Sequence, residues 1–260
     1  AKGDLLAVIV AYMVGKTAFS LWISLAALAE ARRQWDAGWW RVPLRILASE
    51  RRSLLTFAFS TNLSSTVSLV AKDSEVLWVS AFLGPAQAGY YKTALAITNI
   101  LQLPVSPLPK ATYPELAREI ARRNWENVRY VLRQGSRLAA VYSIPVMLVL
   151  VIFGEWILKI SYGAEYVPAY PATVVLAIGF TFVNIFYWNR VALLSLARPV
   201  FPTIINFIGM ILKVAAIFLL AEHFSPVTFA ILLVAYYLFT VGAAVLRVFS
   251  DLRTRPLKIS

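Results

Sequence analysis

Polar and charged side chains recur at helical spacing inside stretches of this sequence that are otherwise apolar. The densest set has steps of three and four residues, which align its members on one helical face: Thr61, Ser65, Ser68, Lys72 and Glu75. Asn62 and Asp73 lie beside that face. Two further stripes have a spacing of seven residues, and they are formed by Lys92 with Asn99 and by Asn206 with Lys213.

Such stripes are expensive inside a membrane, where a central charge costs about 2.5–3.5 kcal/mol or more. Several predicted helices each present one narrow stripe. We therefore expect these side chains to face a shared hydrated cavity that is cationic but holds two carboxylates. Lys72, Lys92 and Lys213 are expected to converge there from three different segments.

Each stripe also has a purely structural interpretation. Asn62, Asn99 and Asn206 can form hydrogen bonds between helices, worth about 1 kcal/mol or less each. Lys72 can be neutralised by Glu75, three residues further along the same helix. The sequence leaves these alternatives open.

The elements that position these residues are predicted to be membrane-spanning helices. Hydrophobic residues make up 60% of the 260 residues, and the mean hydropathy is +0.69, too apolar for an ordinary soluble domain. Each apolar stretch reaches the roughly 20 residues that a helix needs to cross hydrocarbon. We predict seven spans in an all-α bundle: residues 4–29, 54–83, 88–108, 138–160, 172–196, 202–221 and 227–246.

The net charge of +12 indicates orientation rather than nucleic-acid binding. Most of the 25 lysines and arginines fall in alternate gaps between the spans, as cytoplasmic loops require. These groups are 32–52 (six arginines), 110–137 (seven basic residues), Arg190 with Arg198, and the tail from Arg247. The rule places the C-terminus in the cytoplasm and, with seven spans, the N-terminus outside. An odd count with an external start suggests a fragment without its upstream spans.

The residue inventory argues against metal or cofactor chemistry. The chain has no cysteine and one histidine, so thiolate and most imidazole metal sites are excluded. The longest predicted external link, residues 161–171, contains one acidic residue, Glu165. We therefore expect no cofactor, no metal and no enzymatic activity.

The spans divide into two predicted parts. Residues 1–52 form one transmembrane helix and a basic cytoplasmic linker, and residues 53–260 form a six-helix lobe. Within the lobe, apolar positions at helical spacing predict an amphipathic cytoplasmic helix over 112–134. Three prolines, at 104, 107 and 109, predict a bend or break at the end of the third span.

Short motifs carry a resemblance to a known family. Residues 59–97 combine a charged helix, the turn Leu83-Gly84-Pro85 and the sequence Gly89-Tyr90-Tyr91. Tyr113-Pro114-Glu115-Leu116 and Tyr162-Gly163-Ala164-Glu165-Tyr166 follow. In these motifs the chain resembles the polysaccharide flippases of the multidrug/oligosaccharidyl-lipid/polysaccharide exporter superfamily. The resemblance covers nearly the whole chain and aligns it with helices six to twelve of a twelve-helix, two-lobed exporter.

The resemblance implies a function. Flippases of this family move an undecaprenyl-pyrophosphate-linked oligosaccharide across the inner (plasma) membrane by alternating access. On this interpretation Lys72, Lys92 and Lys213, with Asn62, Asn99 and Asn206, bind the cargo. Asp73 and Glu75 are the candidates for proton or sodium coupling. Expected partners are the lipid-linked oligosaccharide, membrane lipids, a polysaccharide polymerase and other export proteins, but no nucleic acid.

Three alternatives to this function are considered. A multidrug antiporter of the same superfamily would export organic cations, but a lysine-rich cavity favours an anionic cargo. A membrane glycosyltransferase or polymerase would act on the same lipid-linked sugars, but would need catalytic carboxylates in a large external loop. A scaffold without transport activity would need no polar stripes within its spans.

Overall fold

We describe a computed structural model of the chain, which defines residues 5–34, 66, 69–70, 74–220 and 225–254. The chain divides into two compact units, residues 1–60 and 61–260. Every secondary-structure element in the described ranges is a helix, as the sequence predicted. The second predicted span, residues 54–83, is described continuously only from Ser74 onward, and Asn62, Lys72 and Asp73 lie outside the described residues.

The first unit contains one long helix, α1 (Leu5–Gln34), which has Arg32 and Arg33 in its last turn. Its 30 residues would measure about 45 Å at 1.5 Å per residue, enough to cross a bilayer. Large apolar side chains along it are exposed, for example Trp22 at 73%. This helix corresponds to the first predicted span and extends it by five residues at the C-terminal end.

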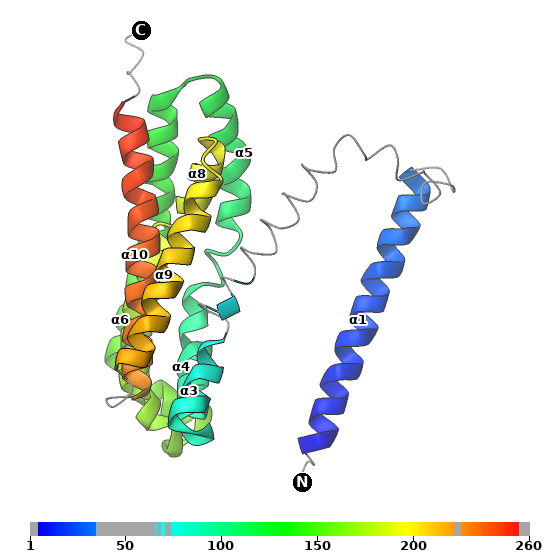
Figure 1. Ribbon diagram of the computed structural model, residues 1–260, viewed down its shortest axis with the longest axis vertical. Helices are drawn as coiled ribbons and strands as arrows, with labels where there is room; N and C mark the ends of the chain where they lie inside the picture. The colour runs from blue at the N-terminus through cyan, green and yellow to red at the C-terminus, as the bar shows by residue number, and fades with distance from the viewer. Residues whose placement is uncertain (1–4, 35–65, 67–68, 71–73, 221–224, 255–260) are drawn as a thin grey trace. The chain divides into compact units, whose positions relative to one another are not determined.

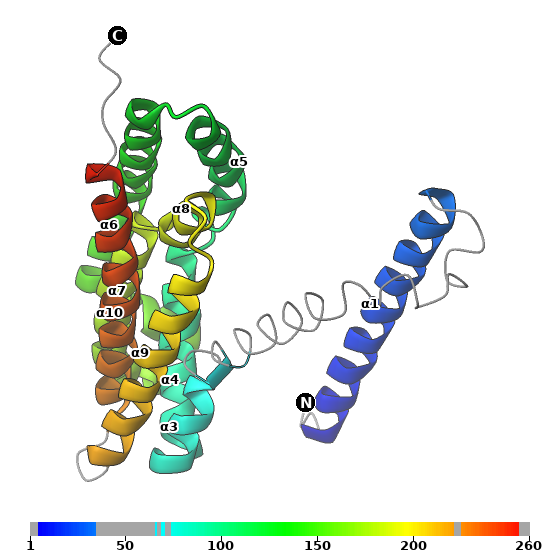
Figure 2. The same cartoon turned by 45° about the horizontal axis from the view of Figure 1, so that its top comes forward.

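The second unit is a bundle of helices that run roughly along a common direction (Figures 1 and 2). Their bounds are α3 (Glu75–Leu83), α4 (Pro85–Thr98), α5 (Leu108–Ala121), α6 (Trp125–Tyr162), α7 (Tyr170–Ile185), α8 (Asn189–Ser195), α9 (Val200–Leu219) and α10 (Pro226–Arg253). Two short 3₁₀ helices, η4 (Asn99–Leu101) and η5 (Ala164–Ala169), lie between them.

Five helical stretches among the described residues are long and apolar enough to cross a membrane, fewer than the seven predicted. They are Val10–Gln34, Trp125–Tyr162, Ala164–Ser195, Val200–Leu219 and Pro226–Arg253. The difference lies in the second predicted span, only part of which is described, and in the third, which is interrupted. The chain is thus a multi-pass membrane protein by helix length and composition.

The third predicted span is broken where the sequence placed three prolines. Helix α4 ends at Thr98, η4 follows, and α5 begins only at Leu108 after a series of turns. A break exposes backbone carbonyls that water cannot reach in a membrane. Side chains of other helices compensate: Tyr142 Oη donates to Ile100 O at 3.1 Å, and Asn184 Nδ2 donates to Leu101 O at 2.7 Å.

The fifth predicted span is also interrupted, and nothing in the sequence indicated this. Helix α7 ends at Ile185, and α8 resumes at Asn189. The carbonyl of Ile185 accepts a hydrogen bond from Ser136 Oγ at 2.8 Å, so the break is again satisfied from a neighbouring helix. Tyr187, within the break, forms a 2.9 Å hydrogen bond with Thr112 of α5.

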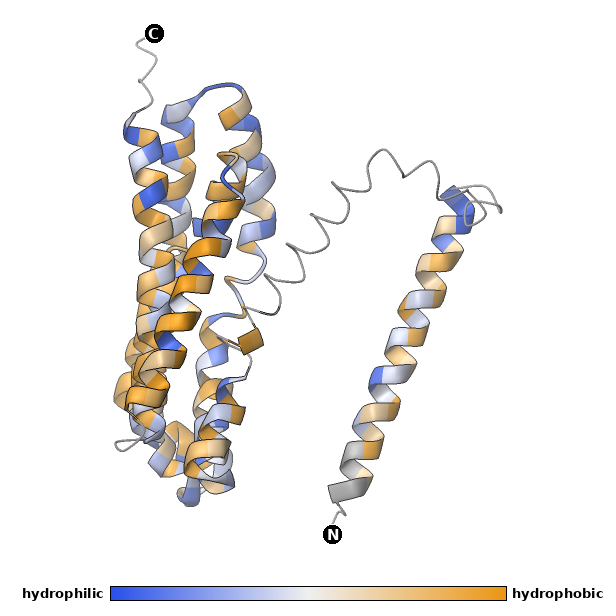
Figure 3. Cartoon of the chain, viewed as in Figure 1, coloured by the Kyte–Doolittle hydropathy of each residue, from blue (hydrophilic) through white to orange (hydrophobic). Residues whose placement is uncertain are grey.

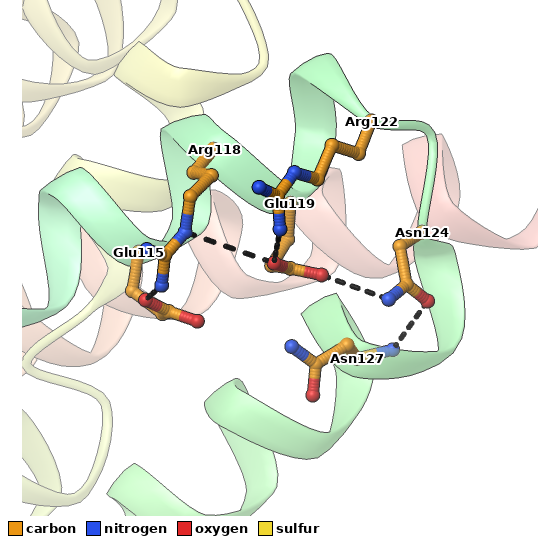
Figure 4. Close-up of polar contacts among 6 residues, drawn as sticks. All are labelled: Glu115, Arg118, Glu119, Arg122, Asn124 and Asn127. Atoms are coloured by element: carbon orange, nitrogen blue, oxygen red, sulfur yellow. Dashed lines mark hydrogen bonds and ion pairs between the residues drawn. The ribbon is translucent and has the colours of Figure 1, made fainter.

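The predicted amphipathic helix over 112–134 is instead a helical hairpin. Helix α5 ends at Ala121, and α6 begins at Trp125 and continues into the membrane span for 38 residues. The buried carboxylate of Glu119 holds the turn, because its Oε2 accepts a hydrogen bond from Asn124 Nδ2 at 2.8 Å (Figure 4). Asn124 in turn caps α6 by accepting from the backbone N–H of Asn127 at 3.3 Å.

Two apolar clusters form the core of the second unit. One is centred on residues of α3, α4, α7 and α10, including Tyr91, Leu176 and Phe229. The other packs α5, α6, α8 and α10 around Leu116 and Trp188. Many other large apolar side chains remain exposed, as a surface facing lipid requires, and Figure 3 shows apolar residues along most of the helical lengths.

The ends of the second unit differ in charge. The α5–α6 turn, the α8–α9 connection and the C-terminal turn of α10 lie at one end (Figures 1 and 2). We call residues 108–137, 186–201 and 247–254 the arginine end, because most basic residues of the unit fall in these segments. The α3–α4 turn and the α6–η5 connection lie at the opposite end (Figure 1).

Candidate functional site

Two of the charged residues singled out from the sequence form a buried ion pair. Lys213 Nζ of α9 contacts Glu75 Oε1 of α3, and the two side chains are only 2% and 1% exposed. Tyr91 Oη of α4 donates a hydrogen bond to the other oxygen, Glu75 Oε2, at 3.0 Å. The Lys213 ammonium also lies 5.8 Å from the centre of the Tyr236 ring of α10, within the range of a cation–π contact.

A tight turn brings two of these residues together. Gly84 has φ +85°, a backbone conformation that residues other than glycine rarely adopt. The chain reverses direction at this residue between α3 and α4. Tyr91 therefore returns alongside the first turn of α3, where Glu75 is located. A carboxylate in the first turn of a helix is also favoured by the helix dipole.

A second close approach brings α10 to Lys213. Asn206, Gly209 and Lys213 are spaced by three and four residues on α9, so they share one face. A Cβ atom added at Gly209 would lie 2.8 Å from Thr240 Cγ2 and 3.1 Å from the Tyr236 ring. The missing side chain thus lets Tyr236 reach Asn206, to which its hydroxyl donates at 3.3 Å. A cavity of about 250 Å³ lies beside Lys213 between these two helices.

The pair is electrically neutral as a unit, and that neutrality explains how it is tolerated among apolar helices. Charges withdrawn from water repay their desolvation only when they are paired and hydrogen-bonded. Glu75 has both an ammonium and a phenol hydroxyl against its oxygens. The arrangement can therefore hold charge in an apolar interior, and separation of α3 from α9 would break the contact between the two charges.

The predicted site residues do not share one environment. Lys92 and Asn99 lie on the exposed surface of the second unit, whereas Lys213 is enclosed with Glu75. Convergence of Lys92 and Lys213 in a single chamber is thus not seen. Glu75 pairs with Lys213, and Lys72, the partner considered from the sequence, lies outside the described residues. Roles in cargo binding and ion coupling stay predictions.

Sequence patterns missed the two tyrosines of this network. Tyr91 is fully buried and Tyr236 is 3% exposed. Tyr91 directly precedes Lys92, and helical spacing places the two on different faces. The apolar neighbours of Tyr91 on its own face, Ala94 and Ala88, were the available signal.

Comparison with known proteins identifies the family. A family model described as "Polysaccharide biosynthesis protein" matches residues 3–171, well over half of the chain. The chain belongs to this family. The match confirms the resemblance to polysaccharide-handling membrane proteins, and it includes Glu75 and Tyr91 but ends before α9.

One curated relative is similar to part of the chain. This is "Inner membrane protein YghQ" of Escherichia coli (strain K12), which is 29% identical over 117 residues. The aligned region covers 44% of this chain and 32% of that protein, so the chain corresponds to about a third of the length of its relative. No solved structure matches.

Two motifs that carried the resemblance contact each other in the structure. Tyr90, from Gly-Tyr-Tyr, packs edge-on against Tyr166, with ring centres 5.9 Å apart. Tyr162 lies 5.7 Å from the same ring. These motifs therefore join α4 to the α6–η5 connection at the end opposite the arginine end.

Proposed function

We propose that this protein is a flippase that transfers a lipid-linked oligosaccharide across the inner membrane. Membership of a polysaccharide biosynthesis family supports a role in handling polysaccharide, and helices long enough to span a bilayer support a location in the membrane. The observation that carries the proposal is the buried Glu75–Lys213 pair with its Tyr91 hydrogen bond. Ionisable groups inside membrane bundles mark transport pathways more often than they serve stability alone.

The mechanism follows from what the pair can do when helices move. A pyrophosphate and its sugars cannot cross hydrocarbon without cationic and hydrogen-bonding groups along the path. Separation of α3 from α9 would break the contact between Lys213 and Glu75, so that the ammonium could bind an anion and the carboxylate could bind a proton or sodium ion. Alternating access would then exchange an internal ion pair for contacts to the cargo and the coupling ion.

This proposal includes orientation and partners. The arginine end faces the cytoplasm by the positive-inside rule, which places the C-terminus inside. The cargo is anionic, and a polysaccharide polymerase on the outer side is the expected recipient. The protein acts without catalysing a covalent step.

Reconstitution tests the function directly. The natural full-length protein would be placed in liposomes with a fluorescent lipid-linked oligosaccharide, and loss of the signal to a membrane-impermeant quencher would report transfer. We expect transfer faster than in empty liposomes, with the oligosaccharide unchanged in length. Transport of organic cations instead would favour the antiporter, and a longer glycan would favour the polymerase.

A further inference from the structure

A cavity of about 460 Å³ lies at the arginine end, between α6, α10 and the α7–α8 break. This volume falls within the range of small-molecule sites, about 300–1,000 Å³. Three of the nine described residues that line it are arginines, and none of the nine is acidic. The sequence assigned these arginines only to orientation in the membrane, so their convergence around a cavity is new.

The arginines come from two helices. Arg129 and Arg133 lie one turn apart on α6, and Arg253 is the last residue of α10. Arg129 is fixed in place, because its Nη2 donates to the Leu252 carbonyl at 2.7 Å. Arg133 and Arg253 are exposed. A guanidinium group presents a planar fork of N–H donors that matches phosphate oxygens, so this set suits a phosphate ester.

Aromatic rings form the other wall. Trp188 is 1% exposed, and Phe186 and Phe249 pack edge-on against it with ring centres 5.9 and 6.0 Å away. The indole N–H of Trp188 donates to Ser136 Oγ at 2.7 Å, which holds the ring in position. Such a rigid apolar surface makes no favourable polar contact with a free phosphate ion, but it can pack against the glycerol and the first acyl-chain carbons of a lipid.

The neighbouring surface of α10 continues this apolar path toward the membrane span. Phe249, which lines the cavity, is 43% exposed, and Leu246, one turn earlier on α10, is 71% exposed. Basic pockets between membrane helices near the bilayer surface are typical sites for anionic lipid headgroups. An acyl chain leaving the cavity would therefore meet the exposed side chains of Phe249 and Leu246 rather than water.

We propose that this cavity binds the phosphate diester headgroup of an anionic bilayer phospholipid. Arg133 and Arg253 hold the phosphate from opposite sides, and the Trp188 wall contacts the start of the acyl chains. The bound lipid joins α6 to α10 and stabilises the arginine end. Lipid binding here is separate from cargo transfer and does not depend on the proposed function.

Native mass spectrometry of the full-length protein in detergent would test this proposal. Phosphatidylglycerol, phosphatidylcholine, undecaprenyl phosphate and inorganic phosphate would be titrated in turn. The test variant is Arg133→Gln/Arg253→Gln. Both side chains are exposed, and neither forms an ion pair or a hydrogen bond with another described residue, so we expect the variant to fold. The matched control, Lys110→Gln/Arg137→Gln, removes the same charge from exposed positions that do not line the cavity.

We expect phosphatidylglycerol to bind with a one-to-one component that weakens about tenfold or more in the test variant and stays unchanged in the control. Phosphatidylcholine should bind more weakly, because its headgroup has no net charge. Equal losses in both variants would show only general surface attraction and overturn the proposal. Arginine-dependent binding of undecaprenyl phosphate or inorganic phosphate, without phosphatidylglycerol, would also overturn it.

Discussion

Burying a lysine and a glutamate among apolar helices costs much more free energy when the two charges are apart than when they are paired. Glu75 and Lys213 are each within 2% of complete burial, and their opposite charges make the pair acceptable in that environment. Tyr91 adds a neutral donor to the second carboxylate oxygen. The network is therefore a stable resting arrangement that can exchange partners only when α3 moves away from α9.

We predict that Glu75→Gln and Lys213→Met, each made alone, destabilise the protein by about 3–5 kcal/mol, because each removes one member of a buried ion pair and leaves the other charge buried. The double variant should recover most of that loss, since both charges are gone. Unfolding of the purified protein in detergent, followed by denaturant titration, gives the coupling energy. Additive effects of the two changes would mean that the pair does not form.

The sequence identified both members of this pair but not their partnership. Spacing by seven residues marked Lys213, and helical steps of three and four marked Glu75, because periodicity reports which face of a helix is polar. It does not report which other helix that face meets. Tyr91 and Tyr236 were missed because neither belongs to a polar stripe. Tyr91 lies near the start of its predicted span, where a tyrosine is typical of an interfacial anchor, and Tyr236 lies in the middle of its span among apolar residues.

At the scale of the helix, breaks rather than continuous spans organise the second unit. Prolines predicted the interruption after α4, because proline removes a backbone donor and prevents regular helix. The carbonyls exposed there are satisfied by Tyr142 and Asn184 from other helices. The break between α7 and α8 contains no proline, so no residue pattern predicted it.

Close contact between α7 and α10 depends on Gly179. A Cβ atom added there would lie 2.9 Å from Val234 Cγ1 and 3.1 Å from Val234 Cβ, and closer still to Cγ2. We predict that Gly179→Ala destabilises the protein by about 1–3 kcal/mol through overpacking. Gly242→Ala, on α10 with open space around it, should be neutral or stabilising by up to about 1 kcal/mol. Thermal unfolding in detergent would compare the two variants.

The α5–α6 turn should be sensitive to one of two neighbouring carboxylates. Glu119→Ala removes the buried acceptor of Asn124 and should cost about 1–3 kcal/mol, with faster hydrogen exchange over residues 118–128. Glu115→Ala breaks only a pair with Arg118 on the exposed surface and should cost less than about 1 kcal/mol. Equal exchange rates in the two variants would show that Glu119 does not hold the turn.

Across the whole molecule, charge is separated along the bundle. The arginine end carries most of the basic residues of α5, α6, α8 and α10, while the opposite end holds the tyrosine contacts of the α6–η5 connection. The sequence anticipated this separation, because the positive-inside rule reads loop charges directly. It did not anticipate the length of α6, whose 38 residues carry Arg129 and Arg133 well beyond the hydrocarbon thickness.

A chain without cysteine allows a direct test of orientation. Glu126→Cys at the start of α6 should react with a membrane-impermeant maleimide only when the cytoplasmic face is accessible. Glu165→Cys in η5 should react in intact cells. Reaction of both positions from the same side would contradict the arrangement in which α6 crosses the bilayer.

The central claim is that the buried pair takes part in transport and not only in folding. Transfer of a labelled lipid-linked oligosaccharide by the reconstituted full-length protein would be compared for the wild type and for Glu75→Gln/Lys213→Met. The matched control is Glu155→Gln/Lys159→Met, which makes the same changes at exposed positions of α6. We predict that the folded double variant loses at least about 90% of the transfer rate, equivalent to about 1.4 kcal/mol or more, while the control retains it. Transfer at the wild-type rate by the double variant would contradict the account.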